Sequence, residues 1–272
     1  MISRKALSAA SLASIGAAML LGSTAAFAQS AEEKLNALDS RITRLEDMDQ
    51  IERVQLTYGY FVDKSQWEPL AELFTEDATL EIGGKGIFTG KARVLEYMQT
   101  AFGADGVKYD SLANHMQFQP LTDVSPEGDE AWMRARAYVM AGGGGGGGWG
   151  LPLYENGYQK GADGKWRISR LTGPFTMYTG WTGWDKWAMN NTWPDKFDPP
   201  PDLPPSTVYL TYPAYYIIPY HYPNPVTGKA MVPSKGEVGA YHRPPGTPEQ
   251  QASLKVGRLA NGTQPIAEPP KD

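Results

Sequence analysis

The sequence of 272 residues contains no cysteine and only three histidines, His115, His221 and His242. The absence of cysteine excludes disulfides, thiol catalysis and every metal site built on thiolates. The three histidines lie far apart and lack the spacing of a metal-binding helix motif, so we expect no histidine-built metal centre. The sequence therefore predicts a core stabilised by burial alone and a functional site without a metal.

Nucleotide-binding loops are absent as well, because no glycine-rich loop of the required spacing precedes a predicted helix. The run Gly142–Gly148 lacks the Lys-Ser/Thr ending of a phosphate loop and follows a strand-like segment, so we interpret it as a flexible loop. Basic residues are in the minority, with 25 Lys and Arg against 30 Asp and Glu. An acidic surface repels nucleic acid and anionic lipid, so we predict neither as a partner, and we expect no cofactor.

The first 28 residues have the layout of a secretory signal peptide. Arg4 and Lys5 form a short basic region, residues 6–24 are almost wholly small or apolar, and residues 26–28 (Ala-Phe-Ala) form a small-x-small cleavage site. No Arg-Arg pair is present, which favours the general secretory route. We therefore expect residues 1–28 to be removed and the mature protein to be periplasmic or secreted.

Three segments carry helical signals. Residues 32–61 have apolar side chains at a helical period, residues 67–74 fit a short helix, and residues 91–102 place their apolar side chains on one side. Residues 79–82 and 86–88, between the second and third helices, predict a small hairpin.

Four longer segments alternate apolar and polar residues, as strands with one buried face do: residues 113–122, 131–140, 151–160 and 166–177. Turn sequences separate them. Three helices followed by these strands indicate an α+β fold, in which a strongly curved, cone-shaped antiparallel sheet packs its concave side against the N-terminal helices.

The C-terminal part of the chain differs from the rest in composition. Of the 22 prolines, 17 lie from Pro194 onward, and residues 209–222 contain six tyrosines. That much apolar surface costs several kcal/mol in water at about 25 cal/mol per Å², so the segment should dock on protein. We predict a domain over residues 29–178, an aromatic, proline-rich extension packed on it over residues 179–235, and a disordered tail over residues 236–272.

Over residues 40–178 a set of motifs is typical of one family: Leu45-Glu46-Asp47, Ile51, Tyr58-Gly59-Tyr60, Asp63, Trp67, Leu70, Phe74, Asp77-Ala78, Gly90-Lys91, Val94, Asn114-His115 and Asp163-Gly164-x-Trp166. In these residues the chain resembles the SnoaL-like (nuclear transport factor 2-like) family. The resemblance implies the cone-shaped fold and an assembly of two or three copies. It leaves the activity open, because this fold hosts dehydratases, isomerases, cyclases and non-catalytic modules.

Two positions match the catalytic pattern of the branch that resembles scytalone dehydratase: Asp63 at the end of the first helix and His115 on the first long strand. The resemblance implies that the Asp63 carboxylate hydrogen-bonds and orients the imidazole of His115, which acts as general base and acid. Tyr58 or Tyr60 would donate a hydrogen bond to a developing oxyanion. If His115 must be neutral, activity should rise with pH through its folded pKa.

The chain departs from that branch near residue 135, where a second strand histidine is expected and Arg134 and Arg136 occur instead. Two arginines there make an anionic or phenolate partner an option, although they also fit a solvated strand face. Asp63 could equally cap a turn, and the tyrosines and tryptophans could be core residues. The candidate substrate-binding residues are Trp67, Arg134, Arg136, Asn156, Trp184, Tyr220 and His221.

Residues 212–229 of the tail are similar to bacterial SnoaL-like lyases acting on lignin-derived diaryl compounds. Those enzymes release formaldehyde from the γ-carbon of the side chain and leave a stilbene. The resemblance implies a cofactor-independent lyase of aromatic compound catabolism and lignin degradation. A dehydratase or isomerase acting on a steroid- or polyketide-like ring, and a non-catalytic small-molecule-binding module, remain alternatives. The tail would close the pocket as a lid or pack on the outer sheet face as a strap.

Overall fold

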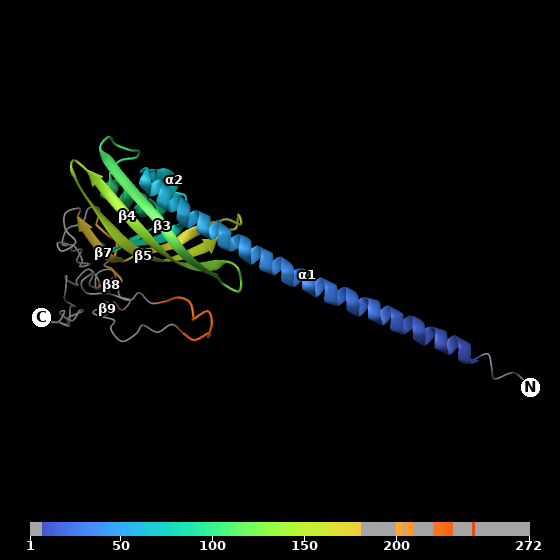
Figure 1. Cartoon of the computed structure of the whole chain (residues 1–272). Coiled ribbons are helices and arrows are strands. Elements are labelled where there is room, and N and C mark those ends of the chain that lie inside the picture. The colour runs from blue at the N-terminus through green and yellow to red at the C-terminus, as the bar shows by residue number, and fades with distance from the viewer. Residues whose placement is uncertain (1–6, 181–199, 204, 209–219, 231–240, 243–272) are drawn as a thin grey trace, which may run out of the picture. The chain divides into compact units, whose positions relative to one another are not determined.

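The computed structural model describes residues 7–180, 200–203, 205–208, 220–230 and 241–242, with residues 7–29, 207–208 and 241–242 described by their backbone alone. The chain divides into two compact units, Met1–Glu46 and Asp47–Asp272. The first helix, α1 (Leu7–Asp63), contributes to both units and contains the helix predicted over residues 32–61 (Figure 1). No helix in the described part of the chain is long and apolar enough to cross a membrane.

Two shorter helices follow α1 in the second unit. The first, α2 (Trp67–Ala71), is shorter than predicted, because Phe74 already starts the first strand and pairs with Ile168. The second, α3 (Lys91–Phe102), has the predicted bounds. Gly90 and Gly103 flank it with φ angles of 95° and 94°, a left-handed region that favours glycine.

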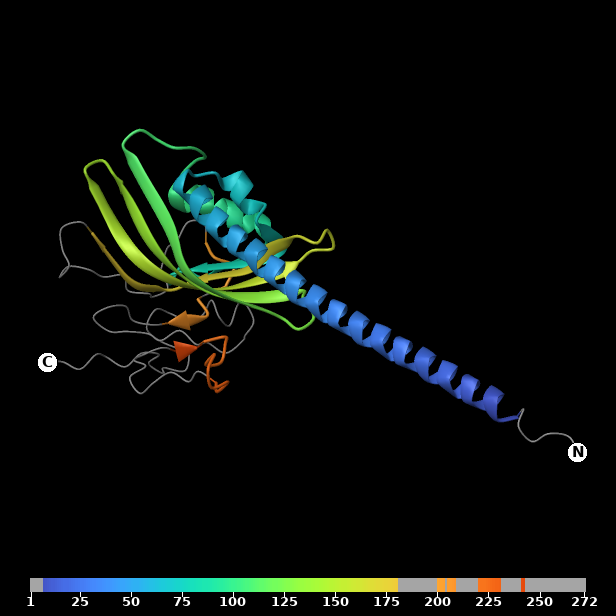
Figure 2. The ribbon, with the colours of Figure 1, turned by 45° about the vertical axis from the view of Figure 1, so that its right-hand side comes forward.

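Seven strands form one curved sheet in the order β2-β1-β6-β5-β4-β3, with β7 also paired to β5 (Figure 2). Their bounds are β1 (Phe74–Ile82), β2 (Ile87–Thr89), β3 (Ser111–Val124), β4 (Glu130–Gly143), β5 (Gly146–Lys160), β6 (Trp166–Gly173) and β7 (Phe175–Gly180). All pairs are antiparallel except β1 with β6, which is parallel. The predicted α+β fold with a curved sheet is confirmed, and this parallel pair makes the sheet a mixed one. The predicted hairpin over residues 79–88 is β1 and β2.

The prediction of one strand over residues 166–177 is wrong in detail. Pro174 has no N–H to donate to a ladder, and the chain divides there into β6 and β7. The two strands pair with different parts of β5: β6 with residues 157–160 and β7 with residues 148–152. The division lets the long strand β5 serve two neighbours on one edge.

The glycine run is not the flexible loop that we predicted. Gly142 and Gly143 end β4, and Gly146, Gly147 and Gly148 begin β5, so most of the run is paired strand. The turn itself is residues 144–145, with φ angles of 59° and 77°, as tight hairpins require. Glycine also allows a close approach by β7, because a Cβ on residue 148 would lie 2.7 Å from the Thr179 carbonyl oxygen.

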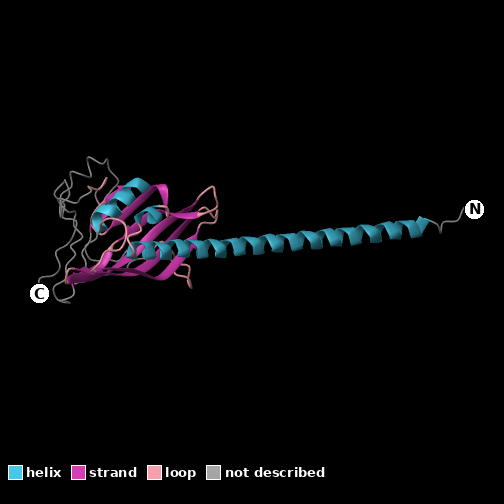
Figure 3. Cartoon of the chain, turned by 90° about the horizontal axis from the view of Figure 1, so that it is seen from above, coloured by secondary structure: helices cyan, strands magenta, loops and turns pink. Residues whose placement is uncertain are grey.

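The core of the second unit lies between the sheet and the helices. Figure 3 shows α2, α3 and the end of α1 together against the strands. Ile51, Tyr58 and Val62 of α1 join residues of α2, α3 and six of the strands in a single buried cluster. Asp47 is buried at the edge of this cluster, where its carboxylate accepts hydrogen bonds from the Trp166 indole at 2.8 Å and from Lys160 at 2.7 Å.

Residues 202 and 206 of the predicted extension contact the sheet and α3. Asp202 accepts a hydrogen bond from the Thr89 amide at 2.7 Å and pairs with Arg93. Ser206 donates to Glu81 at 2.8 Å through its hydroxyl. Within the tail predicted to be disordered, the structure describes only β9 (Tyr241–His242), which pairs with β8 (Thr207–Val208).

Candidate active site

The site begins where α1 covers β3, the edge strand of the sheet. Gly59 makes the close approach possible, because a Cβ at this position would lie 2.5 Å from the carbonyl oxygen of His115. An edge strand presents backbone groups that no neighbouring strand satisfies, and a covering helix is one way to protect them. The packing of α1 on β3 therefore brings the end of the helix beside His115.

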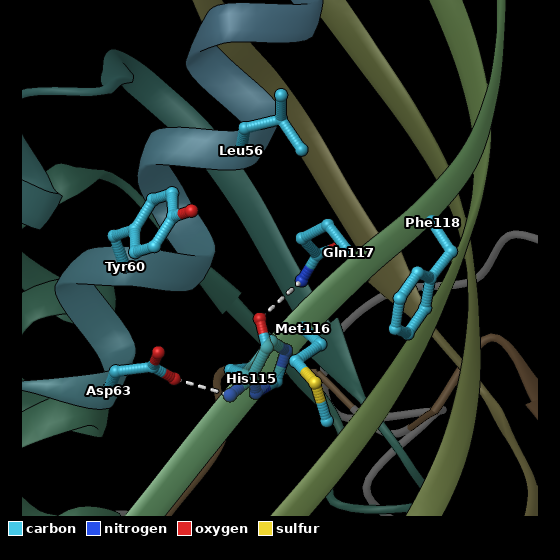
Figure 4. Close-up of a pocket in the computed structure, with 7 residues that line it drawn as sticks. All are labelled: Leu56, Tyr60, Asp63, His115, Met116, Gln117 and Phe118. Carbon is cyan, nitrogen blue, oxygen red and sulfur yellow. Dashed lines mark hydrogen bonds between the residues drawn. The ribbon is translucent and has the colours of Figure 1, made fainter.

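A pocket of about 220 Å³ lies between these two elements. Figure 4 shows its side chains approaching from α1 on one side and from β3 on the other. Leu56, Tyr60 and Asp63 come from the helix, and residues 115–118 (His-Met-Gln-Phe) come from the strand. Tyr60 is 73% exposed and Phe118 is 45% exposed, so two aromatic rings border the opening.

The imidazole of His115 contacts buried tyrosines. Its Nε2 atom lies 2.6 Å from the hydroxyl of Tyr154 on β5, and the Tyr58 ring meets it edge-on with centroids 5.6 Å apart. Burial lowers the pKa of His115 from its ordinary 6.5 to about 4. The imidazole is therefore neutral at neutral pH and able to accept a proton.

Tyr154 links the histidine to a second phenol. It is buried, and its ring meets the Tyr58 ring edge-on with centroids 6.1 Å apart. Burial raises the pKa of both phenols above the ordinary value, so both keep their protons. The imidazole therefore lies in a buried cluster with two protonated phenols, and Tyr154 is the one that bonds to Nε2.

Asp63 is adjacent to His115 as predicted, but its hydrogen-bond partner is different. Its carboxylate accepts a hydrogen bond from the backbone N–H of His115, and the imidazole bonds to Tyr154 instead (Figure 4). The reason is topological: β3 is an edge strand, and the carboxylate satisfies an outward-facing amide. Burial raises the pKa of Asp63. The prediction that Asp63 orients the imidazole directly is corrected to one in which Asp63 fixes the strand that carries it.

A buried amide network stabilises the same helix–strand contact. Gln55 of α1 is 1% exposed and donates to Gln117 of β3 at 2.9 Å. Its amide oxygen accepts from Asn156 at 2.8 Å and from the hydroxyl of Tyr158 at 2.6 Å. Asn156 also accepts from the amide of Thr172 at 3.0 Å. The structure thus places Asn156, a predicted substrate-binding residue, inside this network.

The two candidate oxyanion donors differ in position. Tyr58 is 1% exposed and packs edge-on against the His115 ring, whereas Tyr60 borders the pocket. Trp67 is a core residue: it is 1% exposed and its indole donates to the Gly103 carbonyl oxygen at 2.7 Å. The expectation that Trp67 binds substrate is corrected accordingly.

Arg134 lies on the outer face of the sheet. It faces Glu155 in the β4–β5 register and forms an ion pair with it, whereas the neighbouring Tyr154 points inward to His115. Arg136, two residues further along β4, is exposed on the same face. These arginines are not part of the pocket, and the interpretation as an outer strand face is the one the structure supports.

Tyr220 and His221 lie on the same outer face. The Arg134 guanidinium lies 4.1 Å from the centre of the Tyr220 ring, and Nδ1 of His221 is 2.6 Å from the Glu155 carboxylate. Nε2 of His221 is 3.4 Å from Asp123. Of the two arrangements predicted for the tail, Tyr220 and His221 therefore take that of a strap on the outer sheet face, and the expectation that these two residues bind substrate in this pocket is wrong. Residues 209–219 lie outside the described residues. Trp184 lies outside the described residues.

Sequence reasoning missed Tyr154, Gln55 and Gln117. Tyr154, Asn156 and Tyr158 alternate along β5, so a period of two would have placed all three on one face. No sequence signal identifies which of them meets His115. In the described part of the chain, no three His, Asp or Glu side chains are grouped closely enough to hold a metal ion.

Comparison with known proteins gives the following. Residues 43–172 match the family described as SnoaL-like domain. Among solved structures, an NTF2-like protein with a cystatin-like fold from Novosphingobium aromaticivorans is 24% identical, with 51% of this chain and 87% of that chain covered and a TM-score of 0.43.

Two further solved structures are similar. A hexachlorocyclohexane dehydrochlorinase (LinA) type 2 is 21% identical, with 53% and 94% of the two chains covered and a TM-score of 0.46. ActVI-ORFA from Streptomyces coelicolor is 13% identical, with 47% and 96% covered and a TM-score of 0.41. At these identities the likeness concerns the fold, and we take no activity from it. No curated protein sequence matches this chain.

Proposed function

We propose that the pocket of this chain, whose residues 43–172 match the SnoaL-like domain family, catalyses a cofactor-independent lyase reaction on an aromatic, phenolic substrate, with His115 as the base. One observation carries the proposal: a neutral imidazole whose Nε2 atom lies 2.6 Å from a buried phenol, in the wall of a pocket. A neutral imidazole can accept a proton, and a phenol beside it can return one or stabilise an oxyanion.

The size of the pocket favours one aryl ring rather than two. A dry cavity of about 150 Å³ is large enough for benzene, and this pocket measures about 220 Å³. Tyr60 and Phe118 at its border offer aromatic surfaces on which such a ring can stack. We therefore propose that one ring of the substrate enters the pocket and that the remainder lies across its opening.

The substrate class that we propose is a lignin-derived diaryl compound with a propanoid side chain. Loss of the benzylic hydroxyl as water gives a quinone methide. His115 then takes the γ-hydroxyl proton, and the bond between the β- and γ-carbons breaks as formaldehyde leaves. The electrons of that bond form the double bond between the α- and β-carbons and turn the quinone methide into a phenolate, which takes the proton back from His115. The products are a stilbene, one water and one formaldehyde, which balances all atoms. Support for this class comes from the resemblance of residues 212–229 to diaryl lyases.

The buried tyrosines have a defined part in this scheme. Negative charge develops on oxygen as the proton leaves the γ-hydroxyl, and Tyr154 is the donor nearest to the imidazole. A phenolate brought near His115 would also raise the pKa of the imidazole, because an opposite charge favours the protonated form. The weak base of the empty site would thus become a stronger one when substrate binds.

The test uses the purified chain with β-1 and β-5 type diaryl dimers, with formaldehyde and stilbene absorbance as readouts. We expect both products from the wild type and about a hundredfold slower turnover in His115→Gln. His221→Gln, the same change on the outer sheet face, should turn over like the wild type.

Other outcomes would replace the proposal. Loss of water without formaldehyde would assign a dehydratase. Tight binding of aromatic compounds with no turnover, unchanged in His115→Gln, would assign a non-catalytic binding module. No formaldehyde from any dimer would refute the diaryl version.

We also propose that the chain is exported with residues 1–28 removed, because Arg4, Lys5 and the small residues at 26–28 form a secretory signal. N-terminal sequencing of the protein from a periplasmic fraction should begin at Gln29. An intact Met1 in that fraction would contradict cleavage.

A further inference from the structure

The first compact unit carries an exposed apolar stripe that no part of the proposed chemistry uses. Every residue from 30 to 46 is exposed, and four of these residues are large and aliphatic. Leu35, Leu38, Ile42 and Leu45 are 67%, 52%, 51% and 65% exposed. They lie on one helix, α1, at steps of three, four and three residues, which is the a/d spacing of a coiled coil.

The charges beside this stripe are sorted by sign. With Leu35 and Ile42 at a positions, the e positions are Glu32, Asp39 and Glu46, and the g positions before them are Lys34 and Arg41. All e positions are thus acidic and both g positions are basic. A helix face that was merely solvated would have no reason to separate its charges in this way.

We propose that the stripe is the seam of a parallel coiled coil with a second copy of this chain. In a parallel pair, each g residue faces the e residue five positions further along the partner helix. Lys34 then meets Asp39 of the other copy, and Arg41 meets Glu46. An antiparallel pair would set e against e and g against g, so acid would face acid and base would face base.

The identity of the seam residues agrees with two helices. Isoleucine at an a position with leucine at the d positions favours a two-stranded assembly, and Ile42, Leu38 and Leu45 supply that pattern. Association would remove four large aliphatic side chains per copy from water, which favours the paired state. The stripe spans about two heptads, so we expect a concentration-dependent dimer rather than a permanent one.

A disulfide test separates the parallel pair from its alternatives, because the chain has no cysteine of its own. In a parallel pair, Leu45→Cys brings the two introduced thiols together. In an antiparallel pair with the stripes overlapped, residue 45 faces residue 35 of the partner, so the two introduced cysteines are 10 residues apart, or about 15 Å at 1.5 Å per residue. A disulfide requires Cα atoms within about 7 Å. We expect Leu45→Cys to form a dimer on oxidation.

Ser40→Cys is the matched control, since residue 40 is exposed at the f position on the far side of the helix. It should remain monomeric on a non-reducing gel. Equal cross-linking of both variants, or cross-linking of neither, would overturn the proposal.

A charge exchange then tests the pairing itself, in the Leu45→Cys background. In the first double variant, Lys34→Glu with Arg41→Glu, every e and g position of the stripe is acidic. In the second, Asp39→Lys with Glu46→Lys, the e and g residues that face one another across the seam are all basic. Each double variant alone should cross-link at least tenfold less than its parent. A mixture of the two should form the mixed dimer at the parent level. Unchanged cross-linking of either double variant alone would refute the charge pairing.

Light scattering on the purified chain completes the test. Leu38→Glu puts a charge into the seam. The mass of the assembly should fall to half that of the wild type, and turnover per chain should not change. An assembly that keeps its mass in Leu38→Glu is held by other surfaces, and that result would also refute the proposal.

Discussion

The buried neutral state of His115 predicts how the stability of the protein depends on pH. The imidazole has a pKa of about 4 in the folded chain, against an ordinary value of 6.5. The unfolded chain therefore binds more protons between these two values, and stability rises with pH in that window. The buried imidazole therefore has almost no effect on stability above about pH 6.5, and it destabilises the fold progressively as the pH falls towards 4.

The magnitude follows from the two pKa values. At about pH 7.5 the residue is unprotonated in both states and contributes almost nothing. At about pH 5 the unfolded imidazole is nearly all protonated while the folded one is mostly neutral, and the difference amounts to about 2 kcal/mol. Below about pH 4 the full shift corresponds to roughly 3 kcal/mol.

Urea unfolding of the wild type and of His115→Gln measures this term. Glutamine does not titrate and can keep a hydrogen bond to Tyr154, and all other groups cancel when the two proteins are compared at two pH values. Between about pH 7.5 and 5, the wild type should lose about 2 kcal/mol more than the variant. If the free energy of unfolding of the two proteins falls by the same amount within about 0.5 kcal/mol, His115 is not buried in its neutral form.

Three other predictions follow from the same geometry. The kcat/KM of the wild type should be flat above about pH 5 and fall at lower pH as His115 protonates, so a rise between pH 6 and 8 would assign the base elsewhere. Gly59→Ala places a Cβ 2.5 Å from the His115 carbonyl oxygen, so β3 must shift away from α1. A shift of the base by about 1 Å should lower turnover by about a hundredfold with little loss of helix content. Turnover at the wild-type level would show that β3 does not move. Tyr220→Ala removes a cation–π contact worth about 1 kcal/mol with Arg134, so the Tm should fall by about 2–4 °C at unchanged turnover, whereas lost turnover at an unchanged Tm would restore the lid.

Local pattern was sufficient to predict the framework of the fold. The apolar period of residues 32–61 and the side defined by residues 91–102 identified two helices, because a helical period places apolar side chains on one helix face. Alternation identified the strands β3, β4 and β5, although β3 and β4 extend beyond both predicted ends and β5 begins before its predicted start. Strand ends depend on the partner strand, and a single segment does not contain that information.

The glycine run shows where local chemistry misleads. A run of glycines has no hydrophobic pattern, so it was interpreted as a flexible loop. In the fold, Gly148 and Gly150 lie where a Cβ would meet β7 within 2.7 Å and 2.6 Å. Glycine is needed there because another strand approaches closely, and that requirement is visible only once β7 is placed.

For the site residues, too, one part could be predicted from the sequence and another could not. Asp63 and His115 were predicted as neighbours from a resemblance, and they are neighbours. Their hydrogen bond could not be predicted, because it depends on β3 being an edge strand whose amide needs an acceptor. Tyr154 comes from a strand two places away in the sheet order, and nothing within its own segment links it to His115.

The two faces of the sheet explain why the tail residues were assigned wrongly. Successive residues of β5 point to opposite faces, so Tyr154 reaches the imidazole while Glu155 faces outward to Arg134 and His221. An aromatic tail suggests an aromatic pocket from composition alone. Yet a buried arginine–glutamate pair on the outer face also needs cover, because charges are costly to leave partly desolvated without further partners. Tyr220 and His221 supply both an aromatic face and an imidazole to that pair, so the tail serves the outer face of the sheet while the inner face is left for chemistry.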